Sequence, residues 1–300
     1  MKPSGFAYHR PGTVADAVAL LGEHGPEAKV LAGGQSLVPL LNMRLAAPAH
    51  LVDVNRIDEL DVVRVASVDA GQVVRVGAAA RHSRVEHDPL VHAALPLLRQ
   101  ALVLVAHPTI RHRGTTVGSL AHADPAGEMP AVLALLGGSV TVRSQHGQRE
   151  IRAADFVTGP MTTSVRADEL VTEASFPVPP GRTGSAWVEV ARRAGDYAVC
   201  GVGVLIAVDD DDRIRQARAA LVSMGPVPVV VDLTDAVGAA PFDQADWAAA
   251  ARLVTARVEP DDDIHATAAY RRQLAGVLTA RAGRGAVDHA ATRAEARARR

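Results

Sequence analysis

A glycine pair between two apolar runs is the feature that most restricts the fold of this chain. Residues 28–54, AKVLAGGQSLVPLLNMRLAAPAHLVDV, read as a short strand, a turn through Gly33 and Gly34, a helix and a second strand. Leucines that recur every fourth residue after Ser36 predict the helix, with Ser36 as its N-cap. Glycine allows close backbone approach, and the first N–H groups of a helix lack intrahelical partners, so the turn is suited to bind phosphate. Taken alone, the segment fits a plain tight turn better.

The remaining N-terminal half alternates short helices with hairpins. Thr13 and Asp16 form a capping-box pattern that predicts the start of a helix. Further along the chain we expect a hairpin within 62–80, a helix from Asp88 interrupted at Pro96, a helix ending at Gly137, and a hairpin over 139–151. A strand, loop, helix, strand order mixed with hairpins indicates an α+β fold.

Two adjacent prolines and two glycines in FPVPPGRTG, residues 176–184, predict a domain boundary. Beyond it, the sequence predicts antiparallel strands joined at the acidic DDDD turn, 209–212, and two helices near 243–257 and 265–282. GVGVLI, residues 201–206, has isoleucine where a dinucleotide-binding fingerprint needs its third glycine, and it reads as plain strand.

Composition excludes several classes of function. A formal net charge of −1 over 300 residues gives no field that would favour nucleic acid. No apolar run is long enough for a membrane helix, and the first residues lack the apolar core of a signal peptide. Cys200 is the only cysteine, so the chain holds no internal disulfide and cannot ligate an iron–sulfur cluster by itself. We therefore expect a cytoplasmic protein without a transmembrane segment.

A second turn, rich in small hydroxyl side chains, precedes another short helix. It comprises five residues: Thr115, Thr116, Val117, Gly118 and Ser119. Asp124 and Glu128 follow, and carboxyl groups commonly accept hydrogen bonds from sugar hydroxyls. Neither turn contains a basic residue, so the pair suggests one ligand whose diphosphate is held by backbone amides.

Residues for hydrolytic or metal chemistry are not evident in the sequence. His82, His87 and His92 are five residues apart and do not share a helical face, and no HExxH or Cys/His set occurs. No Gly-x-Ser-x-Gly elbow is present. We expect no metal ligands and no catalytic acid, base or nucleophile.

With both turns identified, the chain resembles a known family. LAGGQSLVPLLNMRLAAPAHLVDVNRI and IRHRGTTVGSLAHADPAGEMPAVLALLG resemble the two flavin-binding motifs of the molybdenum hydroxylase flavoproteins, of the carbon monoxide dehydrogenase medium-subunit and xanthine dehydrogenase FAD-subunit type. RRAGDYAV and DDIHATAAYRRQLAGVL resemble the C-terminal domain of the same family. The resemblance covers nearly the whole chain, in order.

The resemblance implies a fold and a domain division. Residues 1–178 would form a PCMH-type, vanillyl-alcohol-oxidase-like FAD-binding domain with subdomains of about 1–56 and 57–178. Residues 184–284 would form a smaller C-terminal α+β domain, a three-stranded antiparallel sheet with helices, and 285–300 a flexible tail.

The resemblance also implies an FAD site. Residues of the first turn would hold the diphosphate from one side (Ala32, Gly33, Gly34, Gln35, Ser36), and Thr115 to Ser119 from the other. Glu128 would contact the sugar part of FAD, Asp124 matches a further motif residue, and Tyr197 would lie near the isoalloxazine. Val117 departs from the family, which often has glycine there, and it fits only if its φ is negative.

The implied function is electron transfer within an oxidoreductase complex. A large molybdopterin subunit would oxidise the substrate, a small [2Fe–2S] subunit would pass the electrons to FAD, and FAD would reduce quinone, NAD or oxygen. The three chains would form a heterotrimer, whose substrate and acceptor the sequence leaves open. Two alternatives also stay open: a non-redox scaffold that retains the fold, and a free-standing FAD-dependent oxidoreductase.

Overall fold

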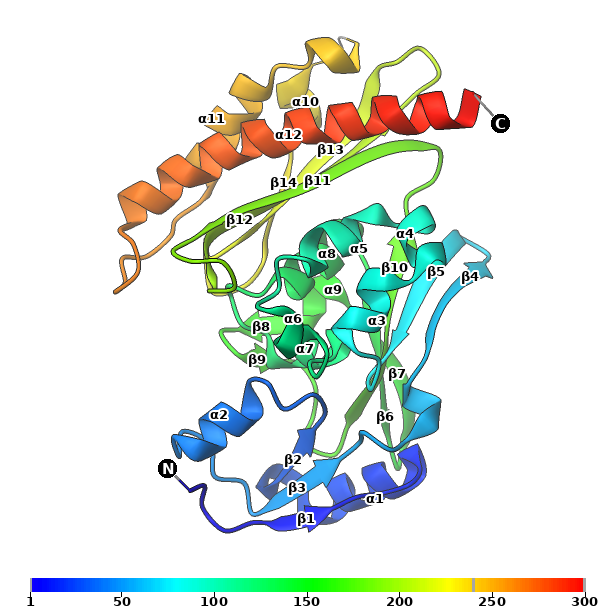
Figure 1. The fold of residues 1–300 in the computed structure, drawn as a ribbon, viewed down its shortest axis with the longest axis vertical. Helices are drawn as coiled ribbons and strands as arrows, with labels where there is room; N and C mark the ends of the chain where they lie inside the picture. The colour runs from blue at the N-terminus through cyan, green and yellow to red at the C-terminus, as the bar shows by residue number, and fades with distance from the viewer. Residues whose placement is uncertain (1, 239–240, 299–300) are drawn as a thin grey trace.

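Three sheets follow one another along the long axis of the molecule, with helices between and around them. The computed structural model describes residues 2–238 and 241–298, the last five of these by their backbone alone. Figure 1 shows the smallest sheet near the N-terminus, the largest in the middle and a third at the far end, beneath the C-terminal helix. The mixed α+β architecture expected from the sequence is confirmed.

The first sheet is parallel, with the strand order β1-β3-β2. Its strands are β1 (Ala7–His9), β2 (Ala28–Leu31) and β3 (His50–Asp53), linked by α1 (Val14–His24), η1 (Gly25–Glu27) and α2 (Leu37–Asn42). Thr13 caps α1 as predicted, because its side chain accepts a hydrogen bond from the Asp16 N–H. The predicted strand, turn, helix, strand order over 28–54 is therefore confirmed.

The second sheet is antiparallel, with the order β4-β5-β10-β6-β7. Its strands are β4 (Val63–Val68), β5 (Gly71–Gly77), β6 (Ser139–Ser144), β7 (Gly147–Arg152) and β10 (Leu170–Val178); β8 (Val157–Gly159) and β9 (Thr162–Thr163) pair separately. The helices of this region are η2 (Asp58–Leu60), α3 (His82–His87), α4 (Pro89–Ala94), α5 (Pro96–Leu102), α6 (Pro108–Arg111), α7 (Thr116–His122), α8 (Glu128–Leu136) and α9 (Ala153–Phe156). Both predicted hairpins, the break at Pro96 and the helix end at Gly137 are confirmed.

The third sheet is antiparallel with four strands in sequence order: β11 (Arg182–Ala191), β12 (Ala198–Val208), β13 (Ile214–Val222) and β14 (Val229–Asp232). Around it lie α10 (Thr234–Val237), η3 (Phe242–Gln244), α11 (Trp247–Arg257) and α12 (Ala268–Ala298). The expectation of three strands misses β14, a short strand that pairs with β13 over four residues. Helix α12 lies along the sheet's outer face, whereas α5 and α8 pack beneath it (Figure 1).

The described part of 285–300, where a flexible tail was expected, is helical. Helix α12 continues through Ala298, while residues 299–300 lie outside the described residues. The physical reason is packing: Ala286 and Ala290 are buried against the sheet, and Gly184 leaves room for them. A Cβ on Gly184 would lie 1.9 Å from the carbonyl oxygen of Ala286.

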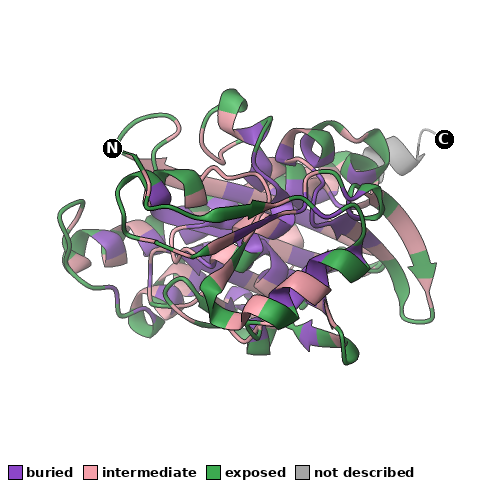
Figure 2. Cartoon of the chain, turned by 90° about the horizontal axis from the view of Figure 1, so that it is seen from below, coloured by how far each residue is buried: buried purple, intermediate pink, exposed green. Residues whose placement is uncertain are grey.

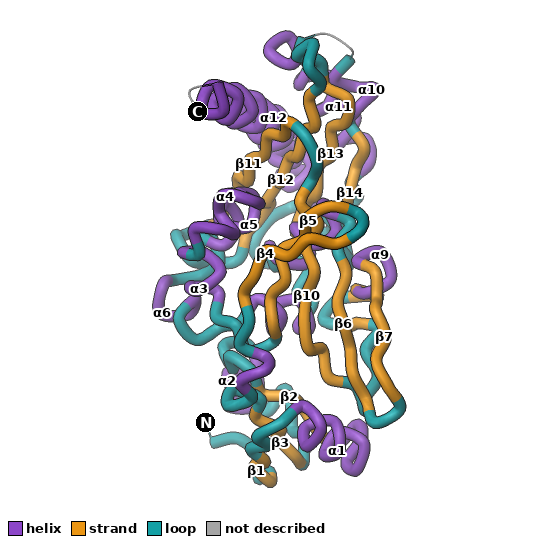
Figure 3. The backbone as a smooth tube through the Cα atoms, turned by 90° about the vertical axis from the view of Figure 1, so that its right-hand side faces the viewer, coloured by secondary structure: helices purple, strands orange, loops and turns teal. Residues whose placement is uncertain are grey.

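Buried side chains form two clusters that meet between the second and third sheets. Figure 2 shows the buried residues along the middle of the molecule and the exposed ones around it. Trp187, Ala198 and Val222 lie in the third sheet but belong to the cluster formed by the middle of the chain. Figure 3 shows the same order of sheets from the side. No helix within 2–238 and 241–298 is long and apolar enough to span a membrane.

Candidate functional site: a two-loop cradle beside a cavity

Two loops that are far apart in the sequence touch at the carboxyl end of the first sheet. We name residues 31–36 the first loop and residues 113–119 the second loop. A Cβ on Gly33 would lie 2.5 Å from the carbonyl oxygen of Arg113 and 2.6 Å from the Cα of Gly114. A Cβ on Gly118 would lie 3.9 Å from the Cβ of Ala32. Glycine at 33 is therefore required for this approach, and the two predicted turns face each other.

The first loop presents backbone donors without partners. Within the described residues, no hydrogen bond engages the N–H groups of Gly33, Gly34, Gln35 or Ser36, which are all half-buried. Gly34 has a φ of +72°, a conformation that costs glycine little. The Gln35 amide donates to the carbonyl of Gly33 at 2.8 Å, which braces the turn. Four N–H groups in one turn form a cradle suited to an anion.

Ser36 does not cap α2, so that prediction is wrong. Its backbone is helical, with φ −96° and ψ −44°, and its side chain makes no cap hydrogen bond. A capping side chain needs an extended backbone to reach back to the helix N–H groups. The Ser36 hydroxyl instead hydrogen-bonds Tyr197, a contact that opposes the rise in the pKa of that phenol caused by burial.

The second loop differs from its predicted form, because its last residues are the first turn of α7. Thr115 is the N-cap, and its Oγ1 accepts the Gly118 N–H at 3.1 Å. The Thr116 N–H donates to the carbonyl of Ala80 at 3.4 Å. Val117 is buried in the core, 2% exposed, and its φ is negative, so glycine is not needed at this position.

Sequence reasoning missed the residues that join the two loops. The Asn55 amide donates to the carbonyl of Ala32 at 2.7 Å, and the Asn55 Oδ1 accepts from Arg81 at 2.6 Å. The second arm of the Arg81 guanidinium donates to the carbonyl of Arg113 at 2.5 Å. The Arg81 guanidinium therefore links the two loops, because one arm contacts Asn55, which holds the first loop, and the other contacts the second loop. The available signal was the polar pair Asp53 and Asn55 at the end of a parallel strand, where ligands commonly bind.

His82 supports the second loop from inside. The backbone N–H of His82 donates to the carbonyl of Gly114 at 2.9 Å, and the ring Nδ1 lies 3.2 Å from the Thr116 hydroxyl. Burial, followed by the positive charge of Arg111, lowers the pKa of His82 to about 4. The imidazole is therefore neutral at physiological pH, and it contacts the loop through its hydrogen bond with Thr116 rather than through charge.

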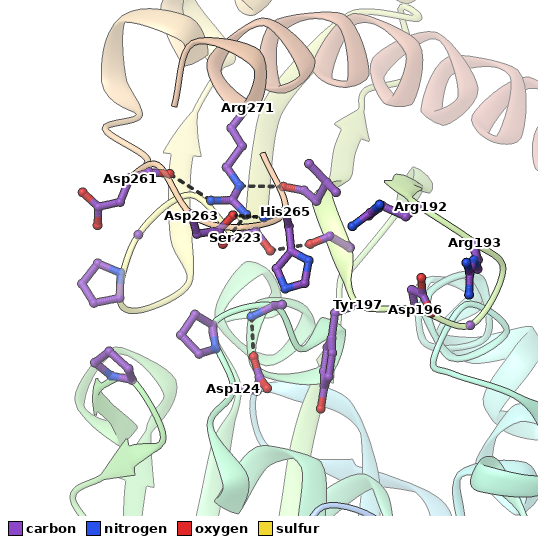
Figure 4. A pocket seen from close by; sticks show the side chains of 18 residues that line it. Asp124, Arg192, Arg193, Asp196, Tyr197, Ser223, Asp261, Asp263, His265 and Arg271 are labelled. Carbon is purple, nitrogen blue, oxygen red and sulfur yellow. Dashed lines mark hydrogen bonds and ion pairs between the residues drawn. The ribbon is translucent and has the colours of Figure 1, made fainter. Parts of the chain in front are cut away.

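Tyr197 and Asp124 lie at the edge of a cavity of about 860 Å³. Figure 4 shows the Tyr197 ring and the Asp124 side chain next to each other, with the phenol oxygen and the carboxyl group pointing the same way. Burial, followed by the charge of Asp124 and a hydrogen bond to it, raises the pKa of Tyr197. The Tyr197 side chain is nonetheless 63% exposed, so its ring is open to a ligand. Tyr197 therefore connects the cavity to the first loop through Ser36, and to the segment after α7 through Asp124.

Glu128 is a buried carboxyl group at the start of α8. Burial, followed by the charge of Glu189, raises the pKa of Glu128 to about 8, so it is protonated at neutral pH. Burial also raises the pKa of Glu189, against a hydrogen bond from the Trp187 indole at 3.2 Å. Glu189 comes from the third sheet, so this carboxyl pair spans the junction between the two halves of the chain.

The far wall of the cavity is fixed by Arg271 on α12. Its guanidinium donates to the carbonyl of Asp261 at 2.9 Å, to the carboxylate of Asp263 at 2.7 Å and to the carbonyl of Val199. These contacts hold the loop before α12 against β12 (Figure 4) and lower the pKa of Asp263 to about 2. Arg192 and Arg193 line the same cavity and are exposed.

Comparison with known proteins agrees with this geometry. A family model described as the FAD binding domain in molybdopterin dehydrogenase matches residues 4–179, and one described as the CO dehydrogenase flavoprotein C-terminal domain matches residues 185–286. These matches define an FAD-binding flavoprotein of the molybdopterin dehydrogenases.

Individual relatives match most of the chain. Carbon monoxide dehydrogenase medium chain from Afipia carboxidovorans is 36% identical over 98% of this chain and 100% of its own. Caffeine dehydrogenase subunit beta from Pseudomonas sp. strain CBB1 is 43% identical over 76% of each chain. The crystal structure of quinoline 2-oxidoreductase from Pseudomonas putida 86 matches with a TM-score of 0.90, at 35% identity over 97% of this chain and 99% of that one. The chain belongs to the FAD-binding medium subunits of the molybdenum hydroxylases.

The residues present fit the family's cofactor, FAD. Four unpartnered N–H groups in the first loop match a diphosphate, and added Cβ atoms at Gly33 and Gly34 would crowd that loop. The open face of Tyr197 beside the cavity leaves room for a planar ring. The chain is thus a flavoprotein subunit of an oxidoreductase.

Proposed function

We propose that this chain is the electron carrier between an iron–sulfur partner and an external acceptor. The observation that supports it most is the contact of the two loops at Gly33 and Gly114, which sets a run of free N–H groups beside the Tyr197 cavity. FAD supplies the redox chemistry when it is bound, because it exchanges electrons singly or in pairs.

Within the first loop, Ala32 to Ser36 hold the diphosphate through their backbone N–H groups. Within the second loop, Thr115 to Ser119 lie across the same group. Thr116 and Val117 are buried, so they contribute backbone and position rather than side-chain contacts. Gly118 and Ser119 are half-buried, and Gly118 lies next to Ala32 of the first loop.

The three remaining site residues contact the other parts of the cofactor, its sugar and its isoalloxazine ring. Protonated Glu128 both donates and accepts a hydrogen bond, which suits a neutral sugar hydroxyl. Asp124 orients the Tyr197 phenol, and the Tyr197 ring packs against the isoalloxazine. These residues bind and orient the cofactor, and none acts as the acid or base of substrate chemistry.

The partners follow from the relatives. The chain assembles with a large molybdopterin subunit, where substrate is oxidised, and with a small [2Fe–2S] subunit that delivers the electrons. We propose the domain division 1–178 and 184–284 for this role, supported by matched ranges that end and begin close to it. Quinone, NAD and oxygen remain candidate acceptors.

The structure bears differently on the two alternatives from the sequence. Val117 was the feature that favoured a scaffold without flavin, and it fits the core with an ordinary helical backbone. A free-standing enzyme would need an acid or base beside the flavin. The cavity holds His265 and several acidic residues, but Asp263 is committed to an ion pair with Arg271.

Reoxidation of the complex tests the proposal directly. The complex is purified through a tag on this chain, its iron–sulfur clusters are reduced with dithionite, and it is mixed with NAD, a quinone or oxygen. Cluster absorbance should return quickly with one acceptor in the FAD-loaded complex and slowly after FAD is removed. Equal rates with and without FAD would rule out the carrier role, and purification of the chain without a partner would favour the free-standing enzyme.

A further inference from the structure

Three histidines from distant positions meet at the edge of the first sheet, away from the FAD loops. His9 is the last residue of β1, His24 the last of α1, and His50 the first of β3. One ring nitrogen from each lies within 4.8 Å of the other two. The His9 Nε2 and His50 Nδ1 atoms are 2.9 Å apart. Parallel pairing of β1 with β3 sets this approach, because Ala7 pairs with His50 and His9 with Val52.

The His50 ring stacks on both other rings, which are tilted by 35° relative to each other. The His24 and His50 ring centroids are 3.7 Å apart, with planes within 10° of parallel, and His9 lies 5.2 Å from each. All three residues are half-buried, so the group is partly shielded but open to solvent on one side. Each neutral imidazole carries its free lone pair in the plane of the ring, so the three nitrogen atoms lie close together but the stacked rings must turn to point at one ion.

We propose that His9, His24 and His50 bind one divalent transition-metal ion of the zinc class. Imidazole nitrogen is a preferred ligand of zinc, copper and nickel, whereas calcium and magnesium prefer oxygen. Zinc–nitrogen bonds of about 2.0–2.1 Å place tetrahedral ligand atoms about 3.4 Å apart. The His9 and His50 nitrogen atoms, 2.9 Å apart, are closer than that value, and the three ligand atoms lie within 4.8 Å of one another, so a turn of the His24 ring at the helix end completes the set. Water takes the fourth position.

The ion would have a structural role rather than a catalytic one. Strand β1 has three residues and pairs with β3 alone, so few hydrogen bonds hold it. A metal at this point joins β1, the end of α1 and the start of β3. The site is separate from the cradle, because His50 begins β3, whereas Asn55, which holds the first loop, follows the strand's end. The expectation of no metal ligands came from the spacing of other histidines, and sequence spacing does not reveal a group assembled from positions 9, 24 and 50.

Metal titration of the purified full chain tests the inference. The FAD-loaded protein is stripped with a chelator, titrated with Zn²⁺ by calorimetry, and heated with and without Zn²⁺. We expect one ion per chain and a higher melting midpoint in its presence. His24→Gln and His50→Ala should weaken binding at least about tenfold, since loss of even an outer partner of a metal ligand costs that much. Neither variant should respond to Zn²⁺ on heating.

His146→Ala is the matched control, because His146 is an exposed histidine on the β6–β7 turn. It should bind Zn²⁺ like the wild type. Flavin absorbance reports whether each variant is folded, and His24, at a helix end, can change with little effect on the sheet. The inference is overturned if the wild type takes up no stoichiometric Zn²⁺, if His24→Gln binds as well as His146→Ala, or if Mg²⁺ raises the midpoint equally.

Discussion

The two loops of the cradle touch each other but are built in opposite ways. The first loop is half-buried, depends on two glycines, and leaves four N–H groups without partners among the described residues. The second loop is mostly buried, and Thr115, Ala80 and His82 engage its backbone. The difference indicates that the first loop supplies the hydrogen-bond donors, whereas the second fixes where those donors stand.

Substitution of Gly33 should have the largest effect on FAD affinity, because it breaks the contact between the loops. In Gly33→Ala the new Cβ would lie 2.5 Å from the carbonyl oxygen of Arg113, so one backbone must move. We expect FAD affinity to fall more than about tenfold. A tenfold loss corresponds to about 1.4 kcal/mol, which lies within the strain energy that overpacking commonly produces. FAD content after purification and fluorescence titration measure it.

Gly12→Ala is the control, because a Cβ on Gly12 meets no atom within 4 Å. It should retain full FAD content. If Gly33→Ala also binds FAD at wild-type affinity, close contact of the loops is not what forms the site.

Acid should weaken the support of the second loop by His82. The first loop should not respond, because it contains no titratable side chain. Because the folded pKa of His82 is about 4, below the unfolded value of 6.5, the unfolded chain binds more protons between these values. The stability due to neutral His82 is complete above pH 6.5 and is lost as pH falls to 4. The loss is about 3 kcal/mol, which urea unfolding at pH 4.5 and 7 measures.

His82→Gln keeps a polar side chain but cannot titrate. Its unfolding free energy should depend less on pH over this range than that of the wild type. His146→Gln, on the exposed turn, should follow the wild-type curve. Identical slopes for His82→Gln and the wild type would show that this imidazole does not set the acid sensitivity.

Much of the fold could be predicted because its signals are local. Thr13 with Asp16, the break at Pro96 and the strand around Gly201 each report on a few neighbouring residues, and each prediction held. The C-terminal helix was missed past residue 282 because its support is distant. Gly283 there is a packing residue: a Cβ would lie 2.1 Å from the Trp247 ring. Sequence alone shows a glycine but not the indole against it.

The site could be predicted in part for the same reason. Both loops carry compact motifs, so their residues could be named in advance. Asn55 and Arg81 could not, because each is a single polar residue whose role exists only when strand β3, helix α3 and the second loop meet. The histidine cluster is the extreme case, with members on three separate elements.

Arg81 should have an intermediate effect, since it links the loops without forming either one. Arg81→Lys keeps the charge but loses the fork that reaches Asn55 and the Arg113 carbonyl together. We expect a loss of about 2 kcal/mol in unfolding free energy, typical of hydrogen bonds from a charged group, and a several-fold weaker FAD affinity.

Arg84→Lys is a matched control on the same helix. Arg84 pairs with Asp61 at 2.7 Å, but both side chains are about half exposed. An exposed pair contributes under about 1 kcal/mol, so FAD affinity should not change. Equal effects of the two substitutions would indicate that charge in α3, and not the link between the loops, is what matters.

The smallest expected effect, that of removing an N-cap, distinguishes a loss of protein stability from a loss of FAD binding. Thr115→Val removes the N-cap of α7 at nearly constant shape, and Thr13→Val does the same for α1, away from the loops. Each should cost about 1 kcal/mol of unfolding free energy, measured in urea. If the second loop only positions the first, Thr115→Val should alter FAD affinity no more than Thr13→Val does. A much larger loss of FAD from Thr115→Val would mean that the second loop binds the cofactor directly, and the two loops would then be equal partners rather than donor and support.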